Sequence, residues 1–434
     1  FLPKKFESIE NIKGYTIKYG HIVEKLQEYK NGEVLENAIV DEVLVSYFKA
    51  PKSYTTENMC EINTHGGNIV VRKILELCLK NGAEMAEPGE FTKRAFLNGR
   101  IDLLQAESVI DIIDAKSERE LKAGMNQLEG QLSKKIHGIK QKIMDVMVNV
   151  EVDIDYPEYD VEEVTNTEIN EMLDVVIADL SRLEKSFDNG KILKDGVKTA
   201  IIGKPNAGKS SLLNCILNEE RAIVTEIEGT TRDTIEEFVT VEGVPLKLID
   251  TAEIREAKDE VEKIGITKSK EIAKDADLII AIFDSSKDLT DEDKEILDII
   301  KNKTAIVVLN KMDLLNKIDE NMAEIKNVSK YIVKMSTLEQ KGIDDLYKSI
   351  GNLFSMEEIS LDNTIVITNI RHKNLISKAL NSCREAKKSM ELGMPLDIIA
   401  IFLKEILENL GEITGETVTD DIIDEIFSKF CLGK

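Results

Sequence analysis

The residues with the clearest chemical purpose lie in the stretch from Val197 to Leu213, VKTAIIGKPNAGKSSLL. An apolar run typical of a strand leads into a loop that ends in Lys209 and Ser210, and an apolar helical pattern follows. In such a loop, backbone N–H groups close around a phosphate, the lysine reaches the terminal phosphates and the serine hydroxyl coordinates Mg2+. The loop residues that we expect to bind a nucleoside triphosphate are Asn206, Ala207, Gly208, Lys209, Ser210 and Ser211.

Two later segments supply groups for the γ-phosphate and for Mg2+. The run from Gly229 to Asp233, GTTRD, carries a threonine about twenty residues after the loop, where its hydroxyl can coordinate Mg2+. A second apolar run ends at Asp250, whose carboxylate can hold a water of the Mg2+ shell. These segments add to the predicted nucleotide contacts Thr225, Thr230, Thr231, Asp250, Thr251 and Ala252.

The tetrad Asn310, Lys311, Met312 and Asp313 follows another apolar run and predicts the base. A carboxylate such as that of Asp313 can accept both the ring N–H and the exocyclic amine of guanine, and adenine offers no matching pair of donors. The segment Ser336-Thr337-Leu338 is placed to give backbone N–H groups to the guanine oxygen. Asn310, Lys311, Asp313 and Ser336 therefore complete the predicted GTP site.

Two positions depart from the usual GTPase pattern. Small GTPases carry a water-orienting Gln just after the DxxG element, but here Ile254 stands in that place and cannot orient water. The segment Asp250-Thr251-Ala252-Glu253 also has a glutamate where DxxG has its glycine, which adds bulk and negative charge near the γ-phosphate. Because of Ile254, hydrolysis needs another group to orient the water. Glu253 motivates an alternative to an active GTPase, namely a GTP-gated scaffold whose hydrolysis is vestigial.

The elements that must position these residues indicate a multidomain chain. Short β-prone runs between Tyr15 and Ile62, then a helix from about Gly67 to Asn81, predict a small α+β domain. Within it, His65 is either a structural residue at a turn or a base in a ligand loop. Buried strands at Leu278–Phe283 and Ala305–Leu309 and a hairpin ending at Asp250 predict an α/β P-loop GTPase domain of the Ras-like kind.

Amphipathic helices flank the GTPase pattern on both sides. Leu, Met and Ile side chains repeat at helical spacing from Leu121 to Val150 and predict one long helix, followed by a break at Tyr156-Pro157-Glu158 and a helix from about Asn170 to Phe187. Helices are also expected over 374–390, 398–410 and 421–430. One all-α bundle with the GTPase inserted into it buries all these faces. The predicted domains are 1–100 (α+β), 101–195 (helical), 196–353 (GTPase) and 354–434 (helical).

Composition limits the class of protein. The formal charge of -24 opposes binding of nucleic acid over a large surface, so any contact with tRNA is expected to be local or supplied by a partner. The same charge disfavours a ribosome-assembly GTPase, which would carry a basic RNA-binding appendage. The five cysteines form no CxxC pair, which favours a reduced cytoplasmic protein. No run is long enough to predict a membrane span. Because the chain opens on Phe1 rather than Met, we expect a segment before it.

Several segments together closely resemble the MnmE (TrmE) family of tRNA modification GTPases, over nearly the whole chain. They are AFLNGRIDLLQAESVIDIIDA (95–115), GKPNAGKSSLLN (203–214), IVTEIEGTTRD (223–233), DEVEKIGI (259–266), GEITGE (411–416) and the terminal CLGK. The resemblance implies a homodimer formed through an N-terminal domain that binds a tetrahydrofolate derivative (the 5,10-methylene or 5-formyl form). It also implies a flavoprotein partner, MnmG (GidA), which holds the FAD. The implied product is a 5-carboxymethylaminomethyl or aminomethyl group on the wobble uridine of tRNA.

The resemblance also assigns roles to single residues. Glu262 in DEVEKIGI matches the catalytic glutamate that orients the attacking water, which fills the gap left by Ile254. It implies K+-activated hydrolysis across the dimer, with K+ held by Asn206, Thr225, Ile227 and Thr230 and Mg2+ held by Ser210 and Thr231. For folate, the matching positions are Glu61, Arg100 and Lys434. The family's opening PPG-rich segment, whose arginine contacts folate, is not in this chain, so the folate site is expected to be incomplete.

Overall fold

The structure is a computed structural model, and it describes residues 2–3, 14–24, 38–155, 162–217, 237–249, 265–318, 323–354 and 365–433. The chain forms two compact units, one of Phe1–Ile110 with Gly411–Lys434 and one of Asp111–Leu410. Helices α3 (Leu103–Ile113) and α14 (Leu396–Thr414) begin in one unit and end in the other. An α+β part, an all-α part and an α/β part are all present, which confirms the predicted fold class.

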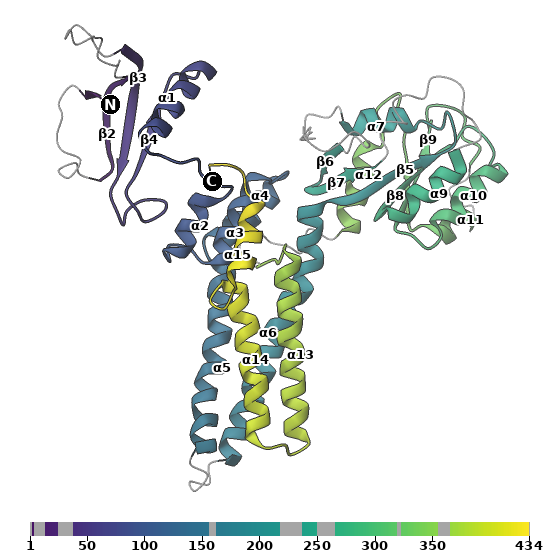
Figure 1. Ribbon diagram of the computed structural model, residues 1–434. Coiled ribbons are helices and arrows are strands. Elements are labelled where there is room, and N and C mark those ends of the chain that lie inside the picture. The colour runs from purple at the N-terminus through teal and green to yellow at the C-terminus, as the bar shows by residue number, and fades with distance from the viewer. Residues whose placement is uncertain are drawn as a thin grey trace. The chain divides into compact units, whose positions relative to one another are not determined.

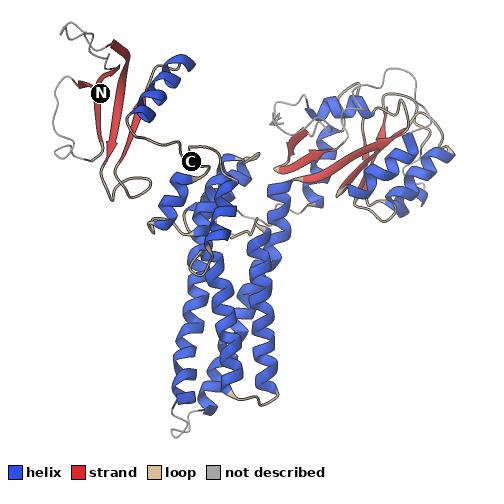
Figure 2. Cartoon of the chain, viewed as in Figure 1, coloured by secondary structure: helices blue, strands red, loops and turns tan. Residues whose placement is uncertain are grey.

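The first unit opens with an antiparallel sheet in the order β1-β2-β3-β4, with α1 packed against it (Figures 1 and 2). The helix contributes Ile74 and Leu77 to a small core with Ile22 and Val43 of the strands. The elements of this unit that lie wholly within it are β1 (Leu2–Pro3), β2 (Thr16–Glu24), β3 (Ala38–Phe48), β4 (Met59–Asn63), α1 (Asn68–Lys80), α2 (Glu90–Leu97) and α15 (Asp420–Ser428).

One apolar residue of α1 does not belong to its buried face. Ile69 is 85% exposed, whereas Ile74 and Leu77 are buried. At about 100° per residue, Ile69 lies about 140° around the helix from Ile74, which turns it away from the sheet. Asn31 and Gly32, a dipeptide typical of a hairpin turn, lie outside the described residues.

The hydrogen bonds of His65 support the structural interpretation of this residue. Its backbone N–H donates to Asp41 Oδ2 at 2.9 Å, and its Nδ1 lies 2.7 Å from Asp41 Oδ1. The backbone hydrogen bond from His65 holds the pKa of Asp41 below its ordinary value. His65 thus ties the end of β4 to β3.

A second core in this unit joins the two ends of the chain. Leu103 and Ala106 of α3 pack with Ile423, Phe427 and Phe430 near α15. Close packing explains why glycine follows α14 at position 415, where φ is +90° and a Cβ would lie 2.7 Å from Leu103 Cβ. The helix predicted over 421–430 is confirmed as α15, which ends at Ser428.

The predicted single long helix from Leu121 to Val150 is wrong, because two helices occupy this stretch. They are α4 (Glu118–Leu128) and α5 (Gln131–Asp155). Gly130 separates them with φ of +79°, a conformation that ends a right-handed helix. The apolar repeat crosses this break without a gap, and Leu121 is 42% exposed, so spacing alone could not reveal it.

The second unit contains a helical bundle of α5, α6, α13 and α14 (Figure 1). Helix α6 packs against both α5 and α13. Ser377 on α13 donates to Glu184 on α6 at 2.5 Å, and Ser382 on α13 donates to Glu405 on α14 at 3.0 Å. The two helical stretches on either side of the GTPase pattern therefore share one bundle, as predicted. The predicted break at 156–158 lies outside the described residues.

Helix α6 is much longer than the predicted segment from Asn170 to Phe187. It runs from Glu162 to Asp195, and only Gly196 separates it from the first strand of the GTPase sheet. The N–H of Gly196 still donates to Ile192 O at 3.1 Å, and a Cβ on this glycine would lie 3.2 Å from Pro245 O. The connection between helix and strand is therefore short and closely packed.

The rest of the second unit is a six-stranded sheet in the order β10-β9-β8-β5-β7-β6, antiparallel only between β6 and β7. Helices α7 and α12 share one apolar core with the sheet, and α9, α10 and α11 share another. The elements wholly within this unit, after α4, α5 and α6, are β5 (Val197–Gly203), α7 (Lys209–Leu217), β6 (Glu237–Val241), β7 (Val244–Leu248), α9 (Gly265–Asp275), β8 (Leu278–Asp284), α10 (Asp291–Ile300), β9 (Ala305–Asn310), α11 (Ala323–Val328), β10 (Tyr331–Lys334), α12 (Ile343–Leu353) and α13 (Ile370–Glu391). Among the helices of the described residues, none combines the length and apolarity that crossing a membrane requires.

Glu120, in the first turn of α4, makes stability depend on pH. Burial raises the pKa of its carboxyl from 4.5 to about 7, although Oε2 accepts a hydrogen bond from the Lys116 N–H at 2.6 Å. The folded state therefore binds this proton more tightly than the unfolded state, and stability decreases as pH rises from about 4.5 through 7. We expect Glu120→Gln to raise the free energy of unfolding by about 1–2 kcal/mol at pH 8, after allowance for solvent screening, and to change little at pH 5.

Denaturant unfolding of the whole chain at pH 5, 6, 7 and 8 measures this difference. Glu118→Gln, an exposed change on the same turn, is the matched control. A gain from Glu120→Gln that is the same at every pH would contradict the assignment.

Candidate functional site

The phosphate loop joins the end of β5 to the start of α7 (Figure 1). Asn206 adopts φ of +61° and Gly208 φ of +111°, so the loop turns twice through the left-handed region. Gly208 must be glycine because a Cβ there would lie 2.1 Å from Asn310 Nδ2. At Gly203 a Cβ would lie 2.5 Å from Ile282 O on β8. The loop therefore has the close backbone packing that a phosphate cradle requires.

Lys209 begins α7 and turns back over the loop. Its ammonium donates to Gly203 O at 2.6 Å and to Lys204 O at 2.9 Å. Both partners are neutral carbonyl oxygens, and burial lowers the pKa of Lys209 from its ordinary value. A cation in such surroundings favours an incoming phosphate, which offers the negative charge that the carbonyls lack.

Asn310 ties the base-recognition segment to the phosphate loop. Its side chain is fully buried, and Nδ2 donates to Ala207 O at 2.9 Å and to Thr337 Oγ1 at 3.2 Å. Its Oδ1 accepts from the Thr337 N–H at 3.0 Å. One amide at the end of β9 therefore connects two loops, and this structural role was not apparent from the sequence.

Asp313 and Ser336, predicted to bind the base, lie together. Ser336 Oγ donates to Asp313 Oδ1 at 2.6 Å, which fixes the carboxylate and leaves its other oxygen available. Nearby, Lys311 has φ of +65° and its ammonium lies 2.7 Å from Asp284 Oδ2. Burial opposes ionisation of Asp284, but the hydrogen bonds from Lys311 and Ser286 outweigh it and hold its pKa below the ordinary value.

The predicted backbone donors to the guanine oxygen need a correction. The N–H of Ser336 donates to Lys341 O at 3.0 Å, and that of Thr337 donates to Asn310 Oδ1. Two of the three N–H groups thus donate to other groups of the protein. The N–H of Leu338 is left as the candidate donor to the guanine oxygen.

Much of the predicted γ-phosphate and metal machinery lies outside the described residues, which stop at Leu217 and resume at Glu237, and stop again at Ile249 and resume at Gly265. Of the predicted metal ligands, Ser210 on α7 and Asn206 in the loop are described. Asn206 lies in the phosphate loop and Ser210 in the first turn of the helix that follows it, so the oxygen donors that are present fit hard cations beside phosphate oxygens. The predicted residues outside the description are Thr225, Ile227, Thr230, Thr231, Asp250, Thr251, Ala252, Glu253, Ile254 and Glu262.

An ion pair beside the loop was missed from the sequence. Lys204 Nζ lies 2.5 Å from Asp293 Oδ2. Lys204 is in the loop that follows β5, and Asp293 is in α10. Asp293 follows Thr290 by three positions, a spacing typical of a helix capping box, so the start of α10 could have been found. The contact between Asp293 and Lys204 could not have been predicted from this spacing, because 89 positions separate the two residues.

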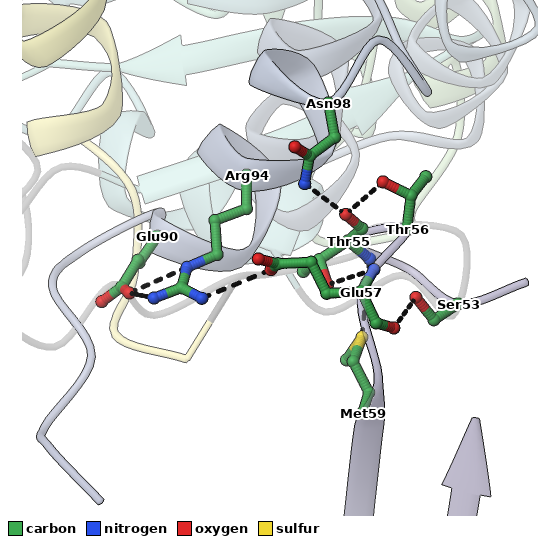
Figure 3. A network of polar contacts seen from close by, with 8 residues as sticks. All are labelled: Ser53, Thr55, Thr56, Glu57, Met59, Glu90, Arg94 and Asn98. Atoms are coloured by element: carbon green, nitrogen blue, oxygen red, sulfur yellow. Dashed lines mark hydrogen bonds and ion pairs between the residues drawn. The ribbon is translucent and has the colours of Figure 1, made fainter. Parts of the chain in front are cut away.

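The predicted folate residues belong to the first unit, where a network of polar contacts orders the loop between β3 and β4 (Figure 3). Asn98 Nδ2 donates to Thr55 O at 2.7 Å, and Arg94 forms ion pairs with Glu90 at 2.6 Å and with Glu57 at 3.3 Å. Figure 3 shows Arg94 lying between the two carboxylates. The loop is thus fixed to α2.

Arg100 lies at one wall of a cavity of about 480 Å3 beside this loop. Its guanidinium donates to Tyr54 O at 2.9 Å and stacks 4.7 Å from the centre of the Tyr54 ring. Tyr15 and Phe48 also line the cavity. Aromatic faces and two cationic residues, Lys52 and Arg100, fit a flat anionic ligand. Glu61 lies on β4, opposite Ser46, and Lys434 is outside the described residues.

Comparisons with known proteins cover the whole chain. Residues 103–431 match the family profile described as "MnmE helical domain", and residues 3–100 match that described as "GTP-binding protein TrmE N-terminus". The chain is 50% identical over 436 residues to the tRNA modification GTPase MnmE of Thermoanaerobacter pseudethanolicus, covering 100% of this chain and 92% of that protein. It is 50% identical over 430 residues to the protein of the same name from Clostridioides difficile, covering 99% and 91%.

A solved structure, the G domain of the T. maritima FeoB iron transporter, is 22% identical and covers 36% of this chain and 98% of its own, with a TM-score of 0.24. No conclusion rests on a score this low.

Proposed function

Since the chain belongs to the MnmE family of tRNA modification GTPases, we propose that it hydrolyses GTP to GDP and phosphate in the modification of the tRNA wobble uridine. The observation that carries the proposal is the joining of two predicted sites by one side chain. Asn310 hydrogen-bonds to the phosphate loop at Ala207 and to the base-recognition segment at Thr337. A ligand that fills both sites must have phosphates at one end and a guanine-like base at the other.

In the proposed mechanism, Asp313 accepts the two N–H donors of guanine while Ser336 holds the carboxylate in place. Lys209 leaves the two loop carbonyls and donates to the terminal phosphates. Glu262 orients the water that attacks the γ-phosphorus, and GDP leaves. Ser210 and Thr231 would hold Mg2+, and Asn206, Thr225, Ile227 and Thr230 would hold K+. When bound, these cations would supply positive charge against the charge that develops on the phosphates.

The reaction on tRNA takes place with a flavoprotein partner, MnmG (GidA), which holds FAD. In this proposal the one-carbon unit comes from a tetrahydrofolate derivative, in the 5,10-methylene or 5-formyl form, bound at Glu61, Arg100 and Lys434. Support comes from the cavity beside Arg100, whose rings and guanidinium fit the flat, anionic chemistry of folate. The incoming unit becomes part of the 5-carboxymethylaminomethyl or aminomethyl group.

A homodimer formed through the N-terminal domain is part of the same proposal. Tyr15, Ile17 and Ile39 on the sheet of the first unit are each 65% exposed, and exposed apolar side chains of this size favour burial against another surface. A cytoplasmic location also belongs to the proposal. All five cysteines lie in the described residues and are free thiols, as expected for a protein in a reducing compartment.

Cells that lack this protein are expected to lose the modified wobble uridine. Mass spectrometry of nucleosides from their tRNA measures it, and re-expression of the intact chain restores it. Re-expression of Lys209→Ala is the informative comparison, because that variant removes the cation of the phosphate loop. An unchanged nucleoside profile in the deleted cells would refute the modification role.

GTP turnover is expected to be at least about tenfold faster in K+ than in Na+ at equal ionic strength, because K+ would add positive charge beside the phosphates to that of Lys209. Turnover per protomer should also rise with protein concentration if hydrolysis needs two protomers. Phosphate release at several protein concentrations in the two salts gives both results. Equal rates in K+ and Na+ would sink the idea of K+ activation.

A further inference from the structure

Lys204 follows Gly203 in the phosphate loop. Its side chain forms an ion pair with Asp293, which is not one of the predicted nucleotide-binding residues. Its ammonium lies 2.5 Å from Asp293 Oδ2 and 2.8 Å from Thr290 Oγ1. The Lys204 side chain is 17% exposed and that of Asp293 5% exposed. Desolvated charges of this kind are retained at well-defined geometry, because each is costly without the other.

Asp293 does not need Lys204 in order to cap its helix. The N–H of Thr290 donates to Asp293 Oδ2 at 2.9 Å, and Thr290 Oγ1 lies 3.0 Å from the same oxygen. Helix α10 is fixed by Ile296, Leu297 and Ile300, which are buried in the core against the sheet. The contact with Lys204 therefore adds a link from an already anchored helix to the phosphate loop.

The backbone of Lys204 contacts the groups that are expected to hold phosphate. Its carbonyl oxygen accepts from Lys209 Nζ at 2.9 Å and from the Ala207 N–H at 3.2 Å. The same residue thus holds the catalytic lysine and the turn of the loop through its carbonyl, while its side chain is held by α10. Rotation of this peptide would move both contacts at once.

We propose that Lys204, held by Asp293, is a positioning residue for the GTPase reaction, because the ion pair orients the Lys204 carbonyl and through it Lys209 and the turn at Ala207. The proposal rests on the proposed GTPase function and deepens it. Because Asp293 pairs with Lys204, the other lysine of the loop, Lys209, has carbonyl partners and no carboxylate partner among the described residues. Misplacement of a phosphate-binding group by a fraction of a bond length is enough to weaken binding strongly.

The test uses the full chain with Lys204→Ala, Asp293→Asn and both changes together. Each single change is expected to raise the Kd for a fluorescent GTP analogue, and the KM for GTP, by about tenfold, with a much smaller change in kcat. The double variant is expected to be no weaker than the weaker single variant, because both changes break the same contact. Lys204→Arg keeps the charge and is expected to restore Kd to within about twofold of the original.

A matched control lies on the same helix. Lys294 and Asp291 form an ion pair at 3.7 Å on the surface of α10, and Asp291 is fully exposed. Lys294→Ala and Asp291→Asn change the same charges at the same helix without touching the loop. We expect both to leave Kd and KM unchanged.

Three results would overturn the proposal. Unchanged Kd values with lowered melting temperatures would mean that the pair only stabilises the fold. Opposite effects, with Lys204→Ala weakening GTP binding and Asp293→Asn strengthening it, would mean that the charges act through their field at a distance. If Lys204→Ala does not fold, Asp293→Asn decides, and binding equal to the original contradicts the proposal. If the unaltered protein binds no GTP, the proposed function itself fails.

Discussion

Lys209→Ala is expected to lower kcat/KM for GTP by about a thousandfold or more, because it removes the cation that faces the terminal phosphates. In the structure, the Lys209 ammonium contacts two neutral carbonyls, those of Gly203 and Lys204. Its burial lowers its pKa, so a phosphate that replaces the carbonyls restores a favourable environment for the charge. The loss therefore falls on the interaction with nucleotide more than on the fold.

Phosphate release under steady-state conditions measures this effect, and thermal unfolding shows whether the variant is folded. Lys198→Ala, which changes an exposed lysine on β5, removes the same charge from the strand that leads into the loop and is expected to keep the original kcat/KM. If Lys209→Ala retained more than about a tenth of the original kcat/KM, Lys209 would not have the role assigned to it.

Asp313→Asn is expected to change the preferred base from guanine to xanthine, by about a thousandfold in the ratio of affinities. A carboxylate accepts from the guanine amine, but it repels the oxygen that xanthine carries in that place. An amide can present its N–H2 to that oxygen. Ser336 Oγ donates to Asp313 Oδ1 at 2.6 Å, and the same bond to the carbonyl of Asn would point the amide nitrogen toward the base.

Competition between GTP and XTP for a fluorescent analogue gives the ratio directly. Asp344→Asn, an exposed change in the first turn of α12, is the control and is expected to leave the preference for GTP intact. A variant at Asp313 that still prefers GTP by the original margin would show that another group reads the base.

The phosphate loop was predictable because its signal is local. Gly203, Gly208 and Lys209 lie within seven consecutive positions, and the close approaches of the structure explain both glycines. The strands of the GTPase sheet were predictable for a similar reason, since fully buried strands such as β8 are continuous apolar runs. Family membership was also predicted from short segments, and the comparisons confirm it.

What could not be predicted depends on contacts between distant positions or on a single backbone angle. Asn310 was assigned to the base, and its bond to Ala207 spans 103 positions. The ion pair of Lys204 with Asp293 spans 89 positions. At Gly130, one left-handed residue ends α4 although the apolar repeat continues. Periodicity reports which face of a helix is apolar, and it does not report where the helix axis changes direction. The bounds of the four predicted domains stay a prediction.

The length of α6 has a mechanical consequence. With 34 residues at 1.5 Å each, it is a rod of ~50 Å, so a rotation of ~5° at its end near β5 would displace the other end by ~4 Å. Only Gly196 separates the rod from the strand that leads to the phosphate loop, and that glycine is packed against Pro245. The helix can therefore act as a lever arm, because its short, packed connection to β5 leaves little freedom for independent movement. A small rotation beside the nucleotide would become a displacement of several ångströms at the far end of the helix.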